Sequence, residues 1–213
     1  MKRNNFIGFE FFAGTQKITK AFNGKLGGCK SLDFVQLKNE RKIDFLMDFL
    51  EFDYRAYNPN NIRFLYFGFP CNTFSKASGG LHWDKEKFKT MESVAAYLMF
   101  LRMAEIIKYF SKAVFYIENP SGAICSQKFF QKWCIDNGFY IYTISQLSFG
   151  YPTQKKTNII TNSKALIVAP DTYRSKGRFQ KVKLENLSLK NRQAYTDSYA
   201  NFIIDNYIYS LNS

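Results

Sequence analysis

The sequence predicts an α/β fold in which strands alternate with helices around a mostly parallel sheet. The chain opens with an apolar segment, residues 6–12, followed by the turn Gly14-Thr15 and a helical pattern from Ile18 to Phe22. Two later apolar runs, Phe64–Phe67 and Ala113–Ile117, are short enough for buried strands. A long segment with helical spacing of apolar residues separates them, as in βαβ units.

The other predicted elements continue this alternation. The predicted strands are 30–35, 140–147 and 157–161, with the last two paired as a hairpin, and the predicted helices are 90–110, 126–137 and 201–211. Gly138 is expected to end the second of these helices, because glycine readily takes the left-handed conformation of a helix C-terminus. Residues 75–89 are polar, basic and glycine-containing, which predicts a mobile loop.

The composition predicts a folded, basic protein. The 213 residues favour one domain, and 46% are hydrophobic, which is enough for a core. Thirty Lys and Arg residues against 17 acidic ones give a formal net charge of +13, which favours a polyanionic partner such as nucleic acid. A basic protein without such a partner is the alternative.

Cysteine and histidine usage argues against a metal site and a disulfide scaffold. The four cysteines have no CxxC spacing, and His82 is the single histidine. Reduced thiols and a cytoplasmic location are the simpler expectation. Glu10 interrupts the N-terminal apolar run too early for a signal peptide, and no run approaches the roughly 20 apolar residues that span a membrane.

Two strand ends carry residues with chemical potential. Pro70-Cys71 follows the run at 64–67, and Glu118 follows the run at 113–117. Ligands of open α/β sheets bind at the carboxyl ends of strands, so the thiol and the carboxylate form a candidate nucleophile and acid pair. The alternatives are a buried structural cysteine and a salt-bridged edge carboxylate.

A second group of candidates lies near the first strand. Phe12-Ala13-Gly14-Thr15 is the turn after this strand, and Asp33 and Asp48 lie where a carboxylate could bind a ribose hydroxyl or a purine amine. Each of these signals is weak alone, because turns and helix caps use the same residue types. His82 is more often structural than catalytic.

Together these strings resemble the C5-cytosine DNA methyltransferase family, in particular its compact, phage-like members. The likeness covers nearly the whole chain in the family's motif order. The matching strings are Glu10–Thr15, Asp33, Asp48-Phe49, Gly68–Ser75 with its Pro-Cys pair, Glu118-Asn119-Pro120 and Gly150–Thr157. The Pro-Cys string is highly specific.

The resemblance implies a Rossmann-like class I methyltransferase fold, a mostly parallel seven-stranded sheet with helices on both faces. It implies S-adenosyl-L-methionine as cofactor and double-stranded DNA as partner, with neither metal nor membrane. The implied catalytic residues are Cys71, Glu118, Asn119 and Lys155. The implied cofactor-binding residues are Phe12, Ala13, Gly14, Thr15, Asp33, Asp48, Phe69 and Pro70. The implied nucleic-acid-binding residues are Ser75, Lys76, His82, Lys156, Arg174, Lys176 and Arg178.

The family mechanism implies attack of Cys71 on C6 of a flipped cytosine, with Glu118 stabilising the ring while C5 is methylated. The chain departs from the family at two places. Gln16 and Lys17 stand where the family has further glycines, and Thr153, Lys155 and Thr157 replace the family's Gln-Arg-Arg pattern.

The expected organisation is a catalytic domain (1–162), a short basic segment in place of a target-recognition domain (163–192) and a returning helix (193–213). So short a segment favours a loose recognition sequence or a protein partner that supplies specificity. A restriction-modification context goes with the resemblance. An inactive nucleic-acid-binding protein of this fold and an RNA methyltransferase are the alternatives.

Overall fold

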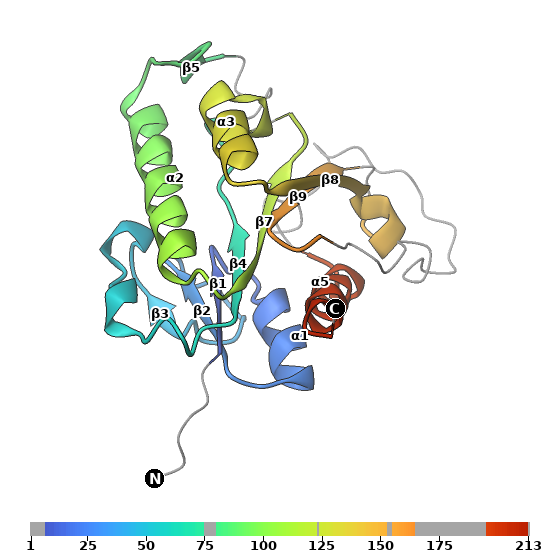
Figure 1. Ribbon diagram of the computed structural model, residues 1–213. Helices are drawn as coiled ribbons and strands as arrows, with labels where there is room; N and C mark the ends of the chain where they lie inside the picture. Colours follow the sequence, from blue (N-terminus) through green and yellow to red (C-terminus); the bar gives the residue numbers. More distant parts are fainter. Residues whose placement is uncertain (1–6, 75–79, 123, 153–154, 165–194, 213) are drawn as a thin grey trace.

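A seven-stranded sheet organises the computed structural model, which describes residues 7–74, 80–122, 124–152, 155–164 and 195–212 (Figure 1). Its strands are β1 (Gly8–Phe11), β2 (Cys29–Asp33), β3 (Phe45–Leu46), β4 (Phe64–Gly68), β7 (Val114–Pro120), β8 (Tyr140–Ser145) and β9 (Lys156–Thr161). The strand order is β3-β2-β1-β4-β7-β9-β8, and only β9 runs against its neighbours within the described residues. The predicted α/β fold is confirmed.

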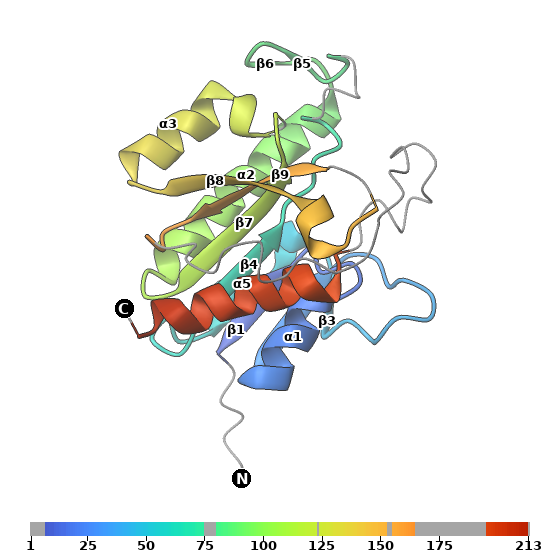
Figure 2. The ribbon, with the colours of Figure 1, turned by 90° about the vertical axis from the view of Figure 1, so that its right-hand side faces the viewer.

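Helices cover both faces of this sheet. Helices α1 (Lys17–Lys25) and α5 (Asp197–Ser210) pack together on one face, and α2 (Met91–Tyr109) and α3 (Lys128–Asp136) lie on the other (Figures 1 and 2). Short 3-10 turns, η1 (Phe49–Glu51), η2 (Tyr54–Ala56), η4 (Ile124–Ser126) and η5 (Gln146–Phe149), connect the elements. Within the described parts of the chain, none of the helices combines the length and apolar character that crossing a membrane requires.

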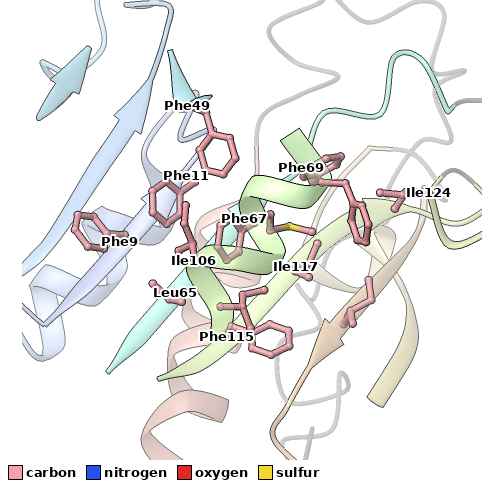
Figure 3. Packing of buried hydrophobic residues seen from close by; sticks show 14 of the residues in the cluster. Phe9, Phe11, Phe49, Leu65, Phe67, Phe69, Ile106, Phe115, Ile117 and Ile124 are labelled. Carbon is pink, nitrogen blue, oxygen red and sulfur yellow. The ribbon is translucent and has the colours of Figure 1, made fainter. Parts of the chain in front are cut away.

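The central strand β4 is apolar along its length because neighbouring residues enter two different cores. In β4, Leu65 and Phe67 belong to the cluster beneath α2, whereas Phe64 and Tyr66 belong to the cluster beneath α1 and α5. Figure 3 shows the first cluster, where the rings of Phe11 and Phe67 stack with centroids 4.8 Å apart. A sheet buried on both faces needs continuous apolar runs rather than alternation, which is why these strands could be predicted from the sequence.

The predicted loop at 75–89 is wrong for its second half. Residues 75–79 lie outside the described residues, but Trp83–Asp84 (β5) and Lys87–Phe88 (β6) form an antiparallel hairpin. Lys85 takes a positive φ of 56° in its turn. Its charged residues are not typical of a strand, so nothing in the sequence indicated the hairpin. Contacts with two aromatic rings stabilise it: the Trp83 ring stacks on that of Phe74, with centroids 5.2 Å apart, and lies 5.9 Å from that of Phe129 in α3.

Candidate active site

The Pro-Cys loop is fixed to the end of β7 by one buried amide. Asn119 is fully buried; its Nδ2 donates to the carbonyl of Phe69 at 2.9 Å, and its Oδ1 accepts from the backbone N–H of Ile124 at 3.2 Å. Phe69 is buried, and the half-buried Pro70 and Cys71 follow it. Because β4 and β7 are paired with Gly68 opposite Glu118, this loop and the carboxylate lie at the same edge of the sheet.

Glu118 is a buried carboxylate with two different partners. The hydroxyl of Tyr195 donates to its Oε2 at 2.9 Å, and the ammonium of Lys155 lies 3.7 Å from its Oε1. The residue is only 4% exposed, and Oε1 has no hydrogen-bond partner among the described residues. A buried carboxylate oxygen of this kind is costly unless a further group binds it, so Oε1 is a candidate ligand-binding atom.

The Cys71 thiol lies within electrostatic range of both groups. Burial raises its pKa above the ordinary value, the Lys155 ammonium lowers it, and the Glu118 carboxylate raises it. Cys71, Glu118 and Lys155 therefore form one cluster, which we call the catalytic cluster. Its thiol rests protonated at neutral pH and needs a proton acceptor before it can attack.

The turn after β1 has an unusual backbone that a buried acid holds in place. Phe12, Gly14 and Gln16 have φ angles of 58°, 48° and 55°, and a non-glycine residue seldom takes such values. The backbone N–H of Gly14 donates to Oδ2 of Asp33 at 2.8 Å, and that of Val35 donates to Oδ1 at 3.2 Å. Strained turns of this kind concentrate at ligand-binding sites.

Gln16 and Lys17, which stand where the methyltransferase family has glycines, do not fill the space beside this turn. The buried side chain of Gln16 accepts from the hydroxyl of Ser31 at 2.9 Å and donates to the carbonyl of Arg41. Lys17 forms a salt bridge with Asp197 of α5 at 2.8 Å. A Cβ added at Gly14 would meet no atom within 4 Å, so the turn keeps open room for a cofactor against its backbone.

The other predicted cofactor residues surround this turn. The backbone N–H of Ala13 donates to Leu32 at 3.1 Å, and Thr15 is half-buried. The ring of Phe12 contacts those of Phe49 at 4.7 Å and Phe69 at 5.7 Å, which joins the turn to the Pro-Cys loop. Asp48 is exposed and caps η1, its Oδ1 accepting from Leu50 at 2.8 Å. Binding of a cofactor by these residues stays a prediction.

Two of the predicted nucleic-acid-binding residues lie within the described chain. Lys156 is exposed on β9, and the ring of His82 hydrogen-bonds through Nδ1 to the hydroxyl of Thr90 at 2.9 Å, at the start of α2. A cavity of about 480 Å³, lined in part by Trp83 and Tyr97, lies beside the hairpin rather than at the catalytic cluster. Outside the described residues lie Ser75, Lys76, Arg174, Lys176, Arg178 and nearly all of the predicted basic segment 163–192.

Two polar residues at the site were missed. Tyr195 is remote in sequence from Glu118, and no local pattern marks it. Glu10 is fully buried in β1, and its Oε2 accepts from the backbone N–H of Thr19 at 2.7 Å. Burial raises the pKa of Glu10 to about 7. The sequence did contain a signal for Glu10, since it is the one charged residue in an otherwise apolar strand. An acid is rarely buried without a partner, so its presence there indicates a specific role.

Comparison with known proteins identifies the fold. No protein-family model matches the chain, and no curated protein matches it. A solved methyltransferase of Entamoeba histolytica, EhMeth, is similar with a TM-score of 0.50 and 14% identity, covering 84% of this chain and 57% of that chain. A Spodoptera frugiperda DNMT2 variant is similar with a TM-score of 0.50 and 13% identity, covering 73% and 49%. The chain thus spans roughly half the length of these structures, and it has a Rossmann-like methyltransferase fold.

Proposed function

We propose that the protein is a C5-cytosine methyltransferase that acts on double-stranded DNA with S-adenosyl-L-methionine. The observation that carries the proposal is the catalytic cluster. It combines a thiol, an ammonium group and a buried carboxylate that keeps one oxygen without a hydrogen-bond partner in the described chain. A structural ion pair needs no thiol beside it, whereas addition to a pyrimidine ring needs a nucleophile and a group that binds the ring polar atoms.

The residues of the cluster divide the reaction between them. Cys71 gives its proton to a base, and its sulfur forms a bond to C6 of a cytosine that has been turned out of the duplex. The C5–C6 double bond breaks, and its electron pair moves to C5 and the ring. Glu118 hydrogen-bonds the ring N3 and the exocyclic amine, which offsets the charge that develops on the ring. Lys155 favours the thiolate form of Cys71. The cofactor supplies the methyl group for C5; loss of the C5 proton to a base and release of the Cys71 sulfur then restore the ring.

The turn after β1 would hold the cofactor. Its open side at Gly14 admits a ligand against the backbone, and Phe12 links it to the Pro-Cys loop. Asp33 keeps this turn in the shape that leaves the room open. The ends of β1, β2 and β4 fix the positions of these residues. These positions in turn set how close the methyl donor lies to the cytosine ring.

Duplex DNA is the favoured substrate because a charge of +13 suits a polyanion and the Pro-Cys loop resembles that of DNA methyltransferases. Sequence specificity would come from a short recognition site or from a protein partner. RNA is the second candidate substrate, because it is also a polyanion, and only the resemblance of the Pro-Cys loop favours DNA over it.

A label-transfer experiment tests the function. Purified protein is mixed with S-adenosylmethionine carrying a tritiated methyl group and with cytosine-rich duplex DNA or with structured RNA. We expect label in DNA from the wild-type protein, none from Cys71→Ser, and equal cofactor binding by both in calorimetry. Label in RNA alone would make the protein an RNA methyltransferase. Absence of label from both polymers, with DNA still bound, would favour the inactive nucleic-acid-binding alternative.

A further inference from the structure

We infer that Tyr195 is a positioning residue for Glu118, holding Oε2 of the carboxylate so that Oε1 remains available to the pyrimidine. This inference rests on the proposed function and assigns a role to a residue for which the sequence predicted none. The hydroxyl of Tyr195 is 2.9 Å from Oε2, closer than Lys155 is to Oε1 at 3.7 Å. Among the described residues, Tyr195 is the hydrogen-bond donor to this carboxylate.

The position of Tyr195 is fixed by the helix that follows it. Thr196 caps α5 by accepting from the backbone N–H of Tyr199 at 3.1 Å, and Asp197 forms its salt bridge with Lys17 of α1. Tyr199, in the first turn of α5, is fully buried and packs on Tyr195 with ring centroids 5.0 Å apart. Docking of α5 onto α1 therefore sets where the Tyr195 hydroxyl lies, with little conformational freedom left to it.

The end of β4 leaves room for this hydroxyl. A Cβ added at Gly68 would lie 2.9 Å from the Tyr195 oxygen and 3.1 Å from the carbonyl oxygen of Phe12. Real Cβ atoms do not approach other atoms as closely as 2.9 Å, so a side chain at Gly68 would displace Tyr195. Glycine is therefore required at position 68 for a steric reason, which is the presence of the Tyr195 side chain next to it.

The protonation state of Tyr195 makes it a constant donor. Burial raises its pKa well above the ordinary tyrosine value, and the nearby Glu118 carboxylate raises it further. The ring of Tyr66 contacts that of Tyr195 with centroids 5.8 Å apart, and the Tyr66 hydroxyl lies 3.2 Å from that of Tyr199, so the three tyrosines form one buried group next to Glu118. Because the Tyr195 hydroxyl donates to Oε2, that oxygen already accepts a hydrogen bond, and Oε1 is the oxygen left for the pyrimidine.

Substitution of Tyr195 by Phe tests the role. We expect kcat for methyl transfer to fall about ten- to hundredfold, as for loss of a hydrogen bond to a charged group, while KM for S-adenosylmethionine stays within twofold. The matched control is Tyr207→Phe, which removes a hydroxyl from a buried tyrosine of α5 whose ring packs on Phe22 and Phe64. We expect its kcat to stay within twofold of wild type.

A double-mutant cycle with Gly68→Ala separates positioning from general disruption. If the added Cβ acts by displacing the Tyr195 hydroxyl, Gly68→Ala should lower kcat in wild type more than in the Tyr195→Phe background. Equal factors in the two backgrounds, or a kcat of Tyr195→Phe within twofold of wild type, would overturn the inference. A wild-type protein that transfers no methyl group would instead contradict the proposed function itself.

Discussion

The carboxylates in the two halves of the candidate site have different kinds of hydrogen-bond donor. In the β1–β2 half, carboxylates accept hydrogen bonds from backbone N–H groups: Glu10 from Thr19, and Asp33 from Gly14 and Val35. In the β4–β7–β9 half, a carboxylate is bound by side chains that come from other parts of the chain. The first arrangement shapes a turn, and the second assembles a reactive group. Substitutions should therefore change folding and cofactor affinity in one half and the rate of transfer in the other.

The largest effect is expected at Asn119. This side chain lies in the β4–β7–β9 half, but like the carboxylates of the other half it hydrogen-bonds to backbone groups. Asn119→Ala leaves the Phe69 carbonyl and the Ile124 N–H buried without partners, which costs about 1–3 kcal/mol for each group. The expected results are a fall of several kcal/mol in the free energy of unfolding, measured by urea titration, and loss of transfer. An unchanged stability would show that the loop does not need this amide.

Glu10 should make the stability of the other half depend on pH. Its pKa is raised from 4.5 to about 7 in the folded state, so the folded protein holds a proton that the unfolded chain releases. Stability is then complete below pH 4.5 and decreases by up to about 3 kcal/mol as the pH rises to 7. We expect Glu10→Gln to flatten this part of the unfolding profile relative to wild type. Parallel profiles would mean that Glu10 is charged in the folded protein.

Asp33 tests whether the first half acts through the backbone of its turn. Asp33→Ala leaves the Gly14 N–H without its acceptor, and we expect S-adenosylmethionine to bind about tenfold more weakly in calorimetry, equivalent to about 1.4 kcal/mol. Asp48→Ala is the matched control, because Asp48 lies after β3 and its carboxylate caps only the short turn η1, at Leu50. An equal loss of affinity in Asp48→Ala would show that Asp48 itself contacts the cofactor.

The smallest effect is expected at Lys155, on the reactivity of a single thiol. Its ammonium lowers the pKa of Cys71, which burial raises. In Lys155→Met, less of the thiol is ionised at pH 8, so alkylation of Cys71 by iodoacetamide should slow a few-fold, with peptide mass spectrometry as the readout. Arginine at this position keeps the charge and should preserve the rate. A rate that does not respond to the loss of charge would separate Lys155 from the thiol.

Features that depend on neighbouring residues in the sequence could be predicted, whereas features that depend on contacts between distant segments could not. The placement of Gly68 opposite Glu118 could be predicted because each follows a continuous apolar run, as is typical of strands buried on both faces. Tyr195 could not, because its contact with Glu118 depends on how α5 docks. The hairpin at residues 83–88 was missed because its stability comes from Phe74 and Phe129 rather than from its own charged sequence.

The hairpin also provides an optical consequence. The chain has two tryptophans, Trp83 and Trp133, and Trp83 stacks on Phe74, three residues after Cys71. Trp133 packs among aromatic rings of α2 and α3, including Phe100. In a Trp133→Phe protein, all indole fluorescence would come from beside the reactive loop, so rearrangement of that loop could be followed in real time without an attached dye.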